Sequence, residues 1–187
     1  MSLTVYKFLW YLISRIEKHK GDESIASIIP VEMTSNIGAH LTMSEIEDPI
    51  PQAAAIPFRE TAAGTLEVLI TRRQDKQKWG IPKGIIDPGH SAHATVRIES
   101  EEEAGIAGCV SQQPIGSYDH HKWGTICHIQ VFLMRVTEEY PNYLEQQFRE
   151  RRWFPWQKAA RMMGQKPVRE LMAQLPALIA QATFDDT

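Results

Sequence analysis

Only two cysteines occur among the 187 residues, Cys109 and Cys127, and both lie in apolar stretches of the chain. Such residues are typical of small core side chains in a reducing compartment, so we expect free thiols and a cytoplasmic protein. Neither sign of charge dominates, because 20 basic and 23 acidic side chains leave a net charge of −3. This balance gives no general attraction to nucleic acid or to membrane surfaces, and we expect no nucleic-acid partner.

A hydrophobic run long enough to cross a membrane is also missing. A span needs about 20 apolar residues, whereas VYKFLWYLISRI at residues 5–16 is shorter and contains Lys7 and Arg15. Residues 18–20, Lys-His-Lys, follow where a signal peptide would need a cleavage site with small residues. We expect an amphipathic helix that packs on the domain or forms a homodimer with a second subunit. Peripheral membrane contact is the less favoured alternative.

The domain organisation follows from length and composition. With 43% hydrophobic residues, the chain can bury a sizeable core, and its length fits one domain with an extension. Residues 21–50 are mixed and polar, with scattered Gly and Pro, and they predict a linker. We therefore predict an N-terminal helix and linker at residues 1–50 and a domain at residues 51–187.

Strand and helix patterns alternate within this domain. The runs AAAIPFR and TLEVLITRR predict a hairpin, and strands are also predicted at residues 108–118 and 125–136. A helix that begins near Ser91 is predicted between them. The segment TEEYPNYLEQQFRERR predicts a polar connection, followed by a short helix in WFPWQKAARMM and a last helix at residues 167–182. This order indicates an α+β or α/β fold.

The segment WGIPKGIIDPGHSAHATVRIESEEEAGI, residues 79–106, carries the strongest functional signal. A turn rich in Gly and Pro runs into a helical segment with Glu99, Glu102 and Glu103 at i, i+3 and i+4 spacing, which shares one helix face. Carboxylates on one face repel one another unless a cation neutralises them, and Mg²⁺ prefers oxygen ligands together with substrate phosphates. A solvated acidic face is the alternative, but the ordered glycines around the helix favour a metal site for phosphate chemistry.

In spacing and residue type, the segment resembles the Nudix box, Gly-x5-Glu-x7-Arg-Glu-U-x-Glu-Glu-x-Gly-U, where U is a bulky aliphatic residue. Counted from Gly84, the glutamates of the box fall on Glu99, Glu102 and Glu103, and its last glycine falls on Gly105. Three positions depart from the pattern. His90 replaces the first Glu, Ile98 replaces the Arg, and Ser100 replaces an aliphatic residue.

The resemblance implies an α/β/α sandwich of class α+β, with a mixed sheet flanked by helices, and a hydrolase that cleaves phosphoanhydride bonds. It implies that Glu99, Glu102 and Glu103 are the metal ligands, that one of them is the base, and that a carbonyl near Gly84 completes the coordination of Mg²⁺ or Mn²⁺. In the family, the missing Arg orients the catalytic Glu, so Ile98 leaves Glu99 less well held unless another basic group substitutes.

Basic residues are the candidates for substrate contact. The segment RERRWFPWQKAARMM followed by KPVRELMAQL resembles diphosphoinositol polyphosphate phosphohydrolases, whereas WGIPKG is also similar to dinucleoside polyphosphate hydrolases. Arg149, Arg151 or Arg152 are phosphate candidates by this match, and adenine stacking on Tyr118, Tyr140 or Tyr143 is the alternative to a structural role for these rings. For the DHHK run at residues 119–122, placed in a loop, we expect phosphate contact or plain exposure. The predicted substrate-binding residues are Arg72, Arg73, Lys83, Lys122, Arg152 and Lys166.

The sequence thus predicts a metal-dependent hydrolase of a diphosphoinositol polyphosphate or a dinucleoside polyphosphate. The competing hypothesis, motivated by His90 and Ile98, is a Nudix-fold binding or regulatory module that has lost its chemistry. An enzyme acting on RNA ends is not favoured, because no basic stripe with interleaved aromatic residues is present.

Overall fold

The computed structural model describes residues 49–122 and 125–185. The predicted N-terminal helix and the dimer contact assigned to it lie outside these residues. The described elements are β1 (Ile50–Glu60), β2 (Leu66–Arg73), β3 (Lys83–Ile85), α3 (Ala92–Ala104), β4 (Ile106–Val110), β5 (Gly116–Lys122), β6 (Thr125–Glu139), β7 (Arg149–Pro155), α4 (Trp156–Met162), α5 (Lys166–Ala173) and α6 (Leu175–Gln181).

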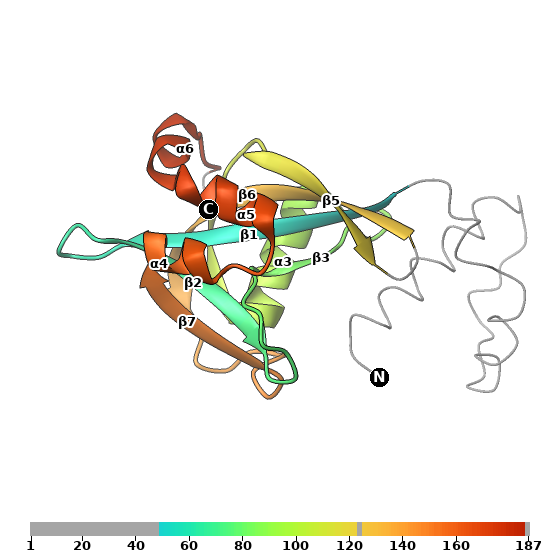
Figure 1. Ribbon diagram of the computed structural model, residues 1–187, viewed down its shortest axis with the longest axis horizontal. Helices are drawn as coiled ribbons and strands as arrows, with labels where there is room; N and C mark the ends of the chain where they lie inside the picture. The colour runs from blue at the N-terminus through green and yellow to red at the C-terminus, as the bar shows by residue number, and fades with distance from the viewer. Residues whose placement is uncertain (1–48, 123–124, 186–187) are drawn as a thin grey trace, which may run out of the picture.

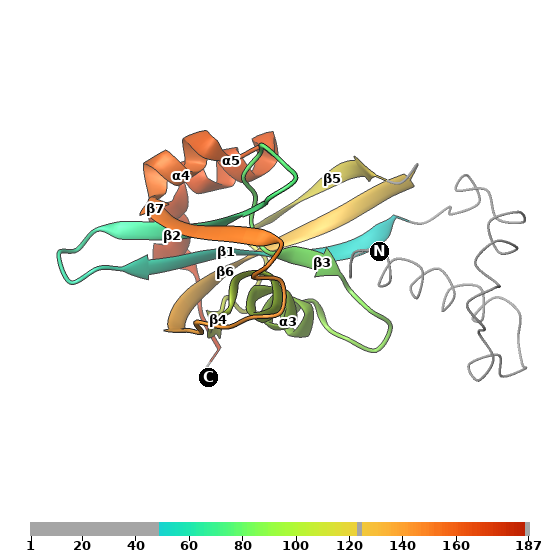
Figure 2. The same cartoon turned by 90° about the horizontal axis from the view of Figure 1, so that it is seen from below.

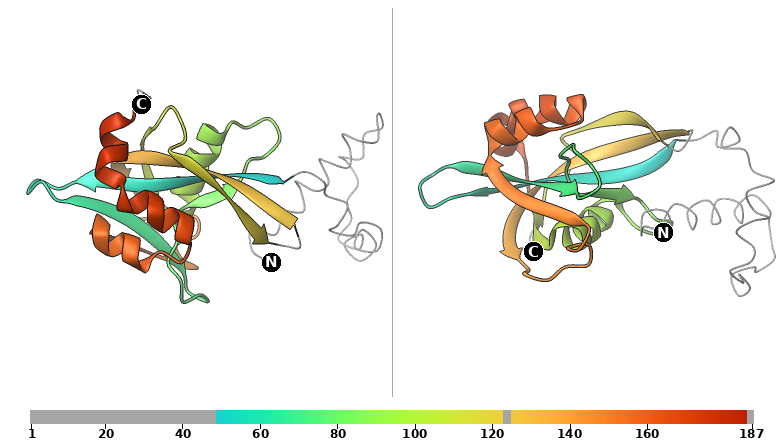
Figure 3. Two further views of the ribbon diagram at one scale, coloured as in Figure 1. Left: turned by 45° about the horizontal axis from the view of Figure 1, so that its top comes forward. Right: turned by 60° about the horizontal axis from the view of Figure 1, so that its bottom comes forward.

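One twisted mixed sheet forms the centre of the molecule (Figure 1). Its main path runs β4-β6-β1-β2-β7, with β3 paired to β1 and β5 paired to β6. Strands β1 and β6 are parallel, and the other pairs are antiparallel. Helix α3 covers one face, whereas α4 and α5 cover the other (Figure 2; Figure 3). The predicted sandwich of class α+β is confirmed.

Strand β1 has apolar side chains on both faces, so helices must pack on both sides of the sheet to exclude water from them. Ala53 and Ala55 belong to the core beneath α3, whereas Ala54 and Ile56 belong to the core beneath the C-terminal helices. Successive side chains of a strand point to opposite faces, so a strand buried on both sides has a nearly continuous apolar sequence. The small alanines leave room for α3 to pack close to the sheet, which places its carboxylates beside β3.

Local signals at the two ends of α3 are confirmed. Ser91 Oγ accepts a hydrogen bond from Ala94 N at 3.1 Å, as expected for a cap near this residue. Gly105 has a left-handed φ of 58°, and its N–H donates to Glu101 O at 2.9 Å. The hairpin of β1 and β2 is present, with Phe58 opposite Val68, and both cysteines are free.

Several predicted boundaries are wrong. The strand expected at residues 108–118 is two strands, β4 and β5, with Pro114 between them. The DHHK run lies within β5 rather than in a loop, because pairing with β6 outweighs its polar composition. Part of the expected polar connection is β7, which pairs with β2. The last helix is broken between α5 and α6, because Pro176 lacks the N–H needed to continue the ladder.

The described residues contain no helix whose length and apolar content would let it cross a membrane.

Ser100 places a polar side chain in the apolar core, and the energetic cost of this can be tested. This residue of α3 is fully buried, and its hydroxyl has no hydrogen-bond partner among the described residues. A buried polar group without a partner costs about 1–3 kcal/mol. We expect Ser100→Ala to raise the free energy of unfolding by about 1 kcal/mol, measured by urea denaturation. Ser117→Ala, at an exposed position of β5, is the control and should change little. A destabilised Ser100→Ala protein would contradict this interpretation.

Candidate active site

Two buried carboxylates of α3 form the centre of the site. Glu99 and Glu103 lie one helical turn apart, and only 6% and 4% of their surfaces are exposed. The backbone of Gly84 in β3 lies against Glu99, since a Cβ at position 84 would be 2.0 Å from Glu99 Oε1. Any larger residue would displace this carboxylate. Glycine is therefore required here for close approach.

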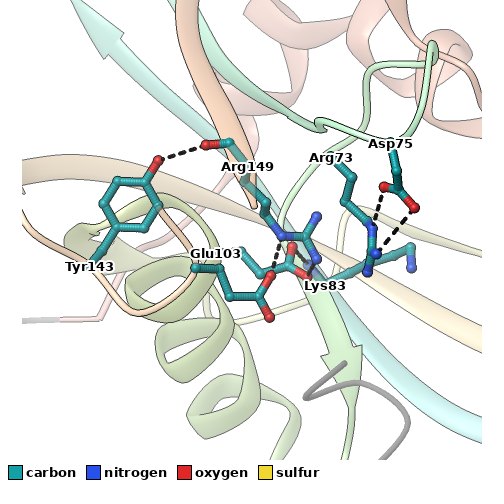
Figure 4. A network of polar contacts seen from close by, with 7 residues as sticks. Arg73, Asp75, Lys83, Glu103, Tyr143 and Arg149 are labelled. Carbon is teal, nitrogen blue, oxygen red and sulfur yellow. Dashed lines mark hydrogen bonds and ion pairs between the residues drawn. The ribbon is translucent and has the colours of Figure 1, made fainter. Parts of the chain in front are cut away.

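Glu103 is held by groups from two other elements (Figure 4). Lys83 N in β3 donates a hydrogen bond to Glu103 Oε2 at 3.2 Å. Arg149, the first residue of β7, forms an ion pair with Glu103 and a second one with Glu145. Burial, together with the charge of Glu99, raises the pKa of Glu103 to about 8, although Arg149 and Lys83 act in the opposite direction. Negative charge at this place is costly and depends on nearby cations.

A cleft of about 560 Å³ opens beside Glu103. Its lining carries more basic than acidic side chains. The acidic ones are Glu103 and Asp75, which pairs with Arg73, and the basic ones come from the loop after β2 and from β2, β3, β5 and β7: Arg73, Lys76, Lys78, Lys83, Lys122 and Arg149. His120 and Trp79 also line it. Cations gathered around a partly enclosed space form a binding place for an anion with several charges.

Burial and neighbouring cations perturb the ionisable side chains of β5. Burial, together with the charges of Lys83 and Arg73, lowers the pKa of Lys122 to about 8, although Cys127 and Glu103 act in the opposite direction. The pKa of His120 is also lowered, first by burial and then by Lys83 and Lys122. A bound anion would relieve this repulsion.

The structure brings together half of the predicted substrate contacts. Arg73, Lys83 and Lys122 line the cleft, whereas Arg72, Arg152 and Lys166 are absent from its lining. Arg72 stacks on Trp79 with its Cζ 4.9 Å from the ring centroid and pairs with Glu150 at 2.6 Å. Arg152 also pairs with Glu150, and Lys166 lies 3.6 Å from Glu170 with 80% of its side chain exposed.

Two of the three box glutamates line different clefts, Glu103 the basic cleft and Glu102 another one. Glu102 is half-buried and lines a second cleft with Glu101 and residues 140–144. Among residues 49–122 and 125–185, no group of three or more His, Cys, Asp or Glu side chains is arranged to hold a metal ion. Glu99 and Glu103 are the pair that the structure places together.

The tyrosines considered for stacking lie elsewhere. Tyr118 is buried, and burial raises its pKa to about 12. Tyr140 and Tyr143 line the second cleft, where Arg151 stacks on the Tyr143 ring. Trp79 is the aromatic residue in the lining of the basic cleft, and Arg72 covers its ring while Phe154 contacts it edge-on. These positions favour structural roles for the tyrosines.

Sequence reasoning misses Glu145, the second carboxylate that pairs with Arg149. The i, i+4 spacing of these two residues is the available signal, since opposite charges at this distance often pair. Arg149 is one of three arginines named as phosphate candidates, and the sequence alone does not separate it from Arg151 and Arg152. His120 belongs to the DHHK run, which lies in a strand that borders the cleft rather than in a loop.

Comparison with known proteins identifies the family. The family model described as NUDIX domain matches residues 49–175, which is more than half of the chain. The chain therefore belongs to the Nudix family. Similar curated proteins of Arabidopsis thaliana include Nudix hydrolase 12, mitochondrial, which is 29% identical over 102 residues, 50% of each chain. Nudix hydrolase 18, mitochondrial, is 33% identical over 106 residues, 56% of this chain and 60% of that protein. The chain spans about half to three fifths of the length of these relatives.

Solved structures show the same fold. The Ap4A hydrolase of C. elegans has a TM-score of 0.58 and 18% identity, with 71% of this chain and 99% of that chain covered. The NUDIX domain of Shewanella oneidensis NrtR, complexed with ADP ribose, has a TM-score of 0.58 and 14% identity, with 78% of this chain and 97% of that chain covered. At these identities the likeness concerns the fold alone.

The contact between Gly84 and Glu99 can be tested by adding one methyl group. Gly84→Ala places a Cβ 2.0 Å from Glu99 Oε1 and 2.2 Å from its Cδ, so the buried side chain must move. We expect the free energy of unfolding to fall by about 1–3 kcal/mol, the usual cost of overpacking, in chemical denaturation. Gly80→Ala is the control, because a Cβ there meets no atom within 4 Å. Equal stability of the two variants would contradict the close packing.

Proposed function

We propose that the chain is a metal-dependent Nudix hydrolase that cleaves a phosphoanhydride bond in a small polyphosphorylated molecule. One observation carries the proposal: the basic cleft is lined by Glu103, which is buried one helical turn from the buried Glu99. Phosphoryl transfer needs positioning and neutralisation of charge on phosphoryl oxygens more than covalent help from the protein. Basic side chains that hold phosphates next to carboxylates that hold a cation meet both needs.

The donor set fits Mg²⁺ or Mn²⁺. Hard cations take oxygen ligands, and two buried carboxylates beside a glycine backbone provide them. Burial raises the pKa of Glu103, so a bound cation would favour its charged form. Glu99 and Glu103 would hold the ion with a backbone carbonyl near Gly84, and Glu102 remains a third candidate ligand by resemblance. When bound, such an ion polarises phosphoryl oxygens and lowers the pKa of bound water.

The chain's own groups divide the remaining work. Arg73, Lys83 and Lys122 bind and orient the phosphates, because they line the cleft. One of the box glutamates accepts the proton of the attacking water. A diphosphoinositol polyphosphate and a dinucleoside polyphosphate are both substrate candidates. The density of cations favours the first, and the similarity to an Ap4A hydrolase supports the second.

A binding or regulatory module without chemistry is the alternative function. His90 and Ile98 motivate it, and a similar domain is described in complex with ADP ribose. The cytoplasmic location stays a prediction, since relatives are named as mitochondrial and chloroplastic proteins. The absence of a nucleic-acid partner also stays a prediction.

A turnover panel separates the two functions. We expect hydrolysis of at least one diphosphoinositol, dinucleoside or nucleoside diphosphate compound with Mg²⁺ or Mn²⁺, and none after chelation. Glu103→Gln should lower kcat roughly 100-fold to 10,000-fold, the span of a lost general base. Glu101→Gln makes the same charge change at an exposed position of α3 and should leave kcat nearly unchanged. Ligand binding that survives chelation, with no turnover in any protein, would favour the binding module.

The role of Lys122 predicts a pH dependence of KM. Because its pKa is lowered to about 8, the ammonium is charged below this pH and loses its proton above it. Phosphate binding should therefore weaken, and KM should rise, as the pH passes through about 8. Lys122→Arg keeps its charge throughout this range and should flatten the rise. If KM of the unmodified protein stays constant between pH 7 and 9, Lys122 does not contact the substrate.

A further inference from the structure

Arg149 is shared between two carboxylates from different parts of the chain. Its Nη2 donates to Glu103 of α3 (Figure 4). Its Nε donates to Glu145, in the segment before β7. The Arg149 side chain is 11% exposed, and those of Glu103 and Glu145 are 5% and 13% exposed. One nearly buried guanidinium is thus shared between two nearly buried carboxylates, so its single positive charge offsets only one of them.

Glu145 is the fixed end of this arrangement. Its backbone N donates to Glu102 O at 3.0 Å, which fastens the segment before β7 to α3. Its backbone O accepts from Arg149 N at 2.9 Å, and Tyr143 Oη donates to Arg149 O at 3.3 Å. The bond from Arg149 Nε to Glu145 can therefore persist while the rest of the guanidinium changes partner.

Glu103 is the partner of Arg149 for which a metal ion would compete. The same carboxylate is needed by a divalent cation in the proposed function, and two positive groups on one carboxylate repel each other. Arg149 also lines the cleft with Arg73, Lys83 and Lys122, where phosphates are proposed to bind. A guanidinium that leaves Glu103 therefore has an anionic partner within the same cleft, and guanidinium matches phosphate geometry well.

Arg151 shows what a purely structural arginine of the same strand looks like. It lies two residues further along β7 and donates to backbone carbonyls, those of Ala104, Gly105 and Tyr140. No cation competes with it for a carboxylate in these bonds. Both partners of Arg149, in contrast, are carboxylates, and one of them, Glu103, lines the cleft proposed to bind phosphates.

We propose that Arg149 is a positioning residue that exchanges partners: it holds Glu103 before the metal binds, and it turns on Glu145 toward a substrate phosphate when a cation takes Glu103. This inference rests on the proposed function, because it assumes that Glu103 is a metal ligand. It predicts opposite effects on metal affinity for the two residues of one ion pair. A merely structural pair would show the same direction for both.

The test is titration of the full chain with Mn²⁺ alone, at one fixed pH and without substrate. Arg149→Gln removes the competing cation, so we expect Mn²⁺ affinity to rise by about fivefold or more, the lower range of coupling between two ligands. Glu145→Gln releases the guanidinium to Glu103 alone, so Mn²⁺ affinity should fall. Arg161→Gln makes the same charge change as Arg149→Gln at an exposed position of α4 and should leave the affinity unchanged.

A second measurement follows the other partner. At saturating Mn²⁺, binding of inorganic pyrophosphate should weaken in Arg149→Gln, because the cleft has lost a phosphate donor. Tighter Mn²⁺ binding together with weaker pyrophosphate binding is the expected signature. Weaker Mn²⁺ binding in Arg149→Gln, or stronger binding in Glu145→Gln, would overturn the exchange and leave Arg149 as a simple clamp.

The Mn²⁺ titrations remain informative if one variant does not fold or if no substrate is turned over. Should Arg149→Gln not fold, as judged by its thermal transition, Glu145→Gln still decides the direction of the Mn²⁺ shift. The Mn²⁺ titrations contain no substrate, so they test the partner exchange of Arg149 independently of catalysis. Absence of turnover on every compound of the panel would count against the proposed hydrolase, and the direction of the Mn²⁺ shifts would still decide the role of Arg149.

Discussion

Burial of two like charges on one helical turn is the constraint around which the site is built. Glu99 and Glu103 lie inside the molecule beside a glycine backbone, where a carboxylate without compensation costs far more than in water. The neighbouring groups lower the free-energy cost of burying these carboxylates. The N–H of Lys83, the guanidinium of Arg149 and the cations of the cleft all bring positive charge toward one helix face. The sheet provides the positions from which they reach it, and the small side chains of Ala53 and Ala55 allow α3 to lie close above β1.

The site is assembled from segments that are distant in the chain. Arg149 follows Glu103 by 46 residues, and it reaches that carboxylate because β7 pairs with β2, with Arg149 opposite Arg73. This register places two arginines side by side at the same end of the sheet, next to the lysine of β3. Strand β5 brings Lys122 from another direction through its pairing with β6. A phosphate cleft with walls from four strands can hold a multiply charged ligand more rigidly than a loop can.

What the sequence could predict was local. The cap at Ser91, the end of α3 at Gly105 and the hairpin between β1 and β2 depend on neighbouring residues, and each is confirmed. What it could not predict depends on partners far away. The sequence RERRWFP has no local strand pattern, and it forms β7 because it pairs with the edge of β2. Likewise, the i, i+3, i+4 spacing places three glutamates within one broad face, but neighbouring positions on a helix are about 100° apart. Strand β3 covers the side of Glu99 and Glu103, and Glu102 turns toward residues 140–144.

The same geometry bears on the departures from the Nudix box. His90 is exposed and its N–H donates to Asp87 O at 2.9 Å, so it serves the turn before α3. Arg97, next to the position where the family has its arginine, pairs instead with Asp185 near the C-terminus and cannot serve the carboxylates. The basic group that faces a box glutamate comes from β7, since Arg149 contacts Glu103. An electrostatic need at one helix face can be met from any element that reaches it. Ile98 at the position of the family's arginine therefore does not leave the helix face without a cation, because Arg149 reaches Glu103, although it is not the partner of Glu99 that the family's pattern would provide.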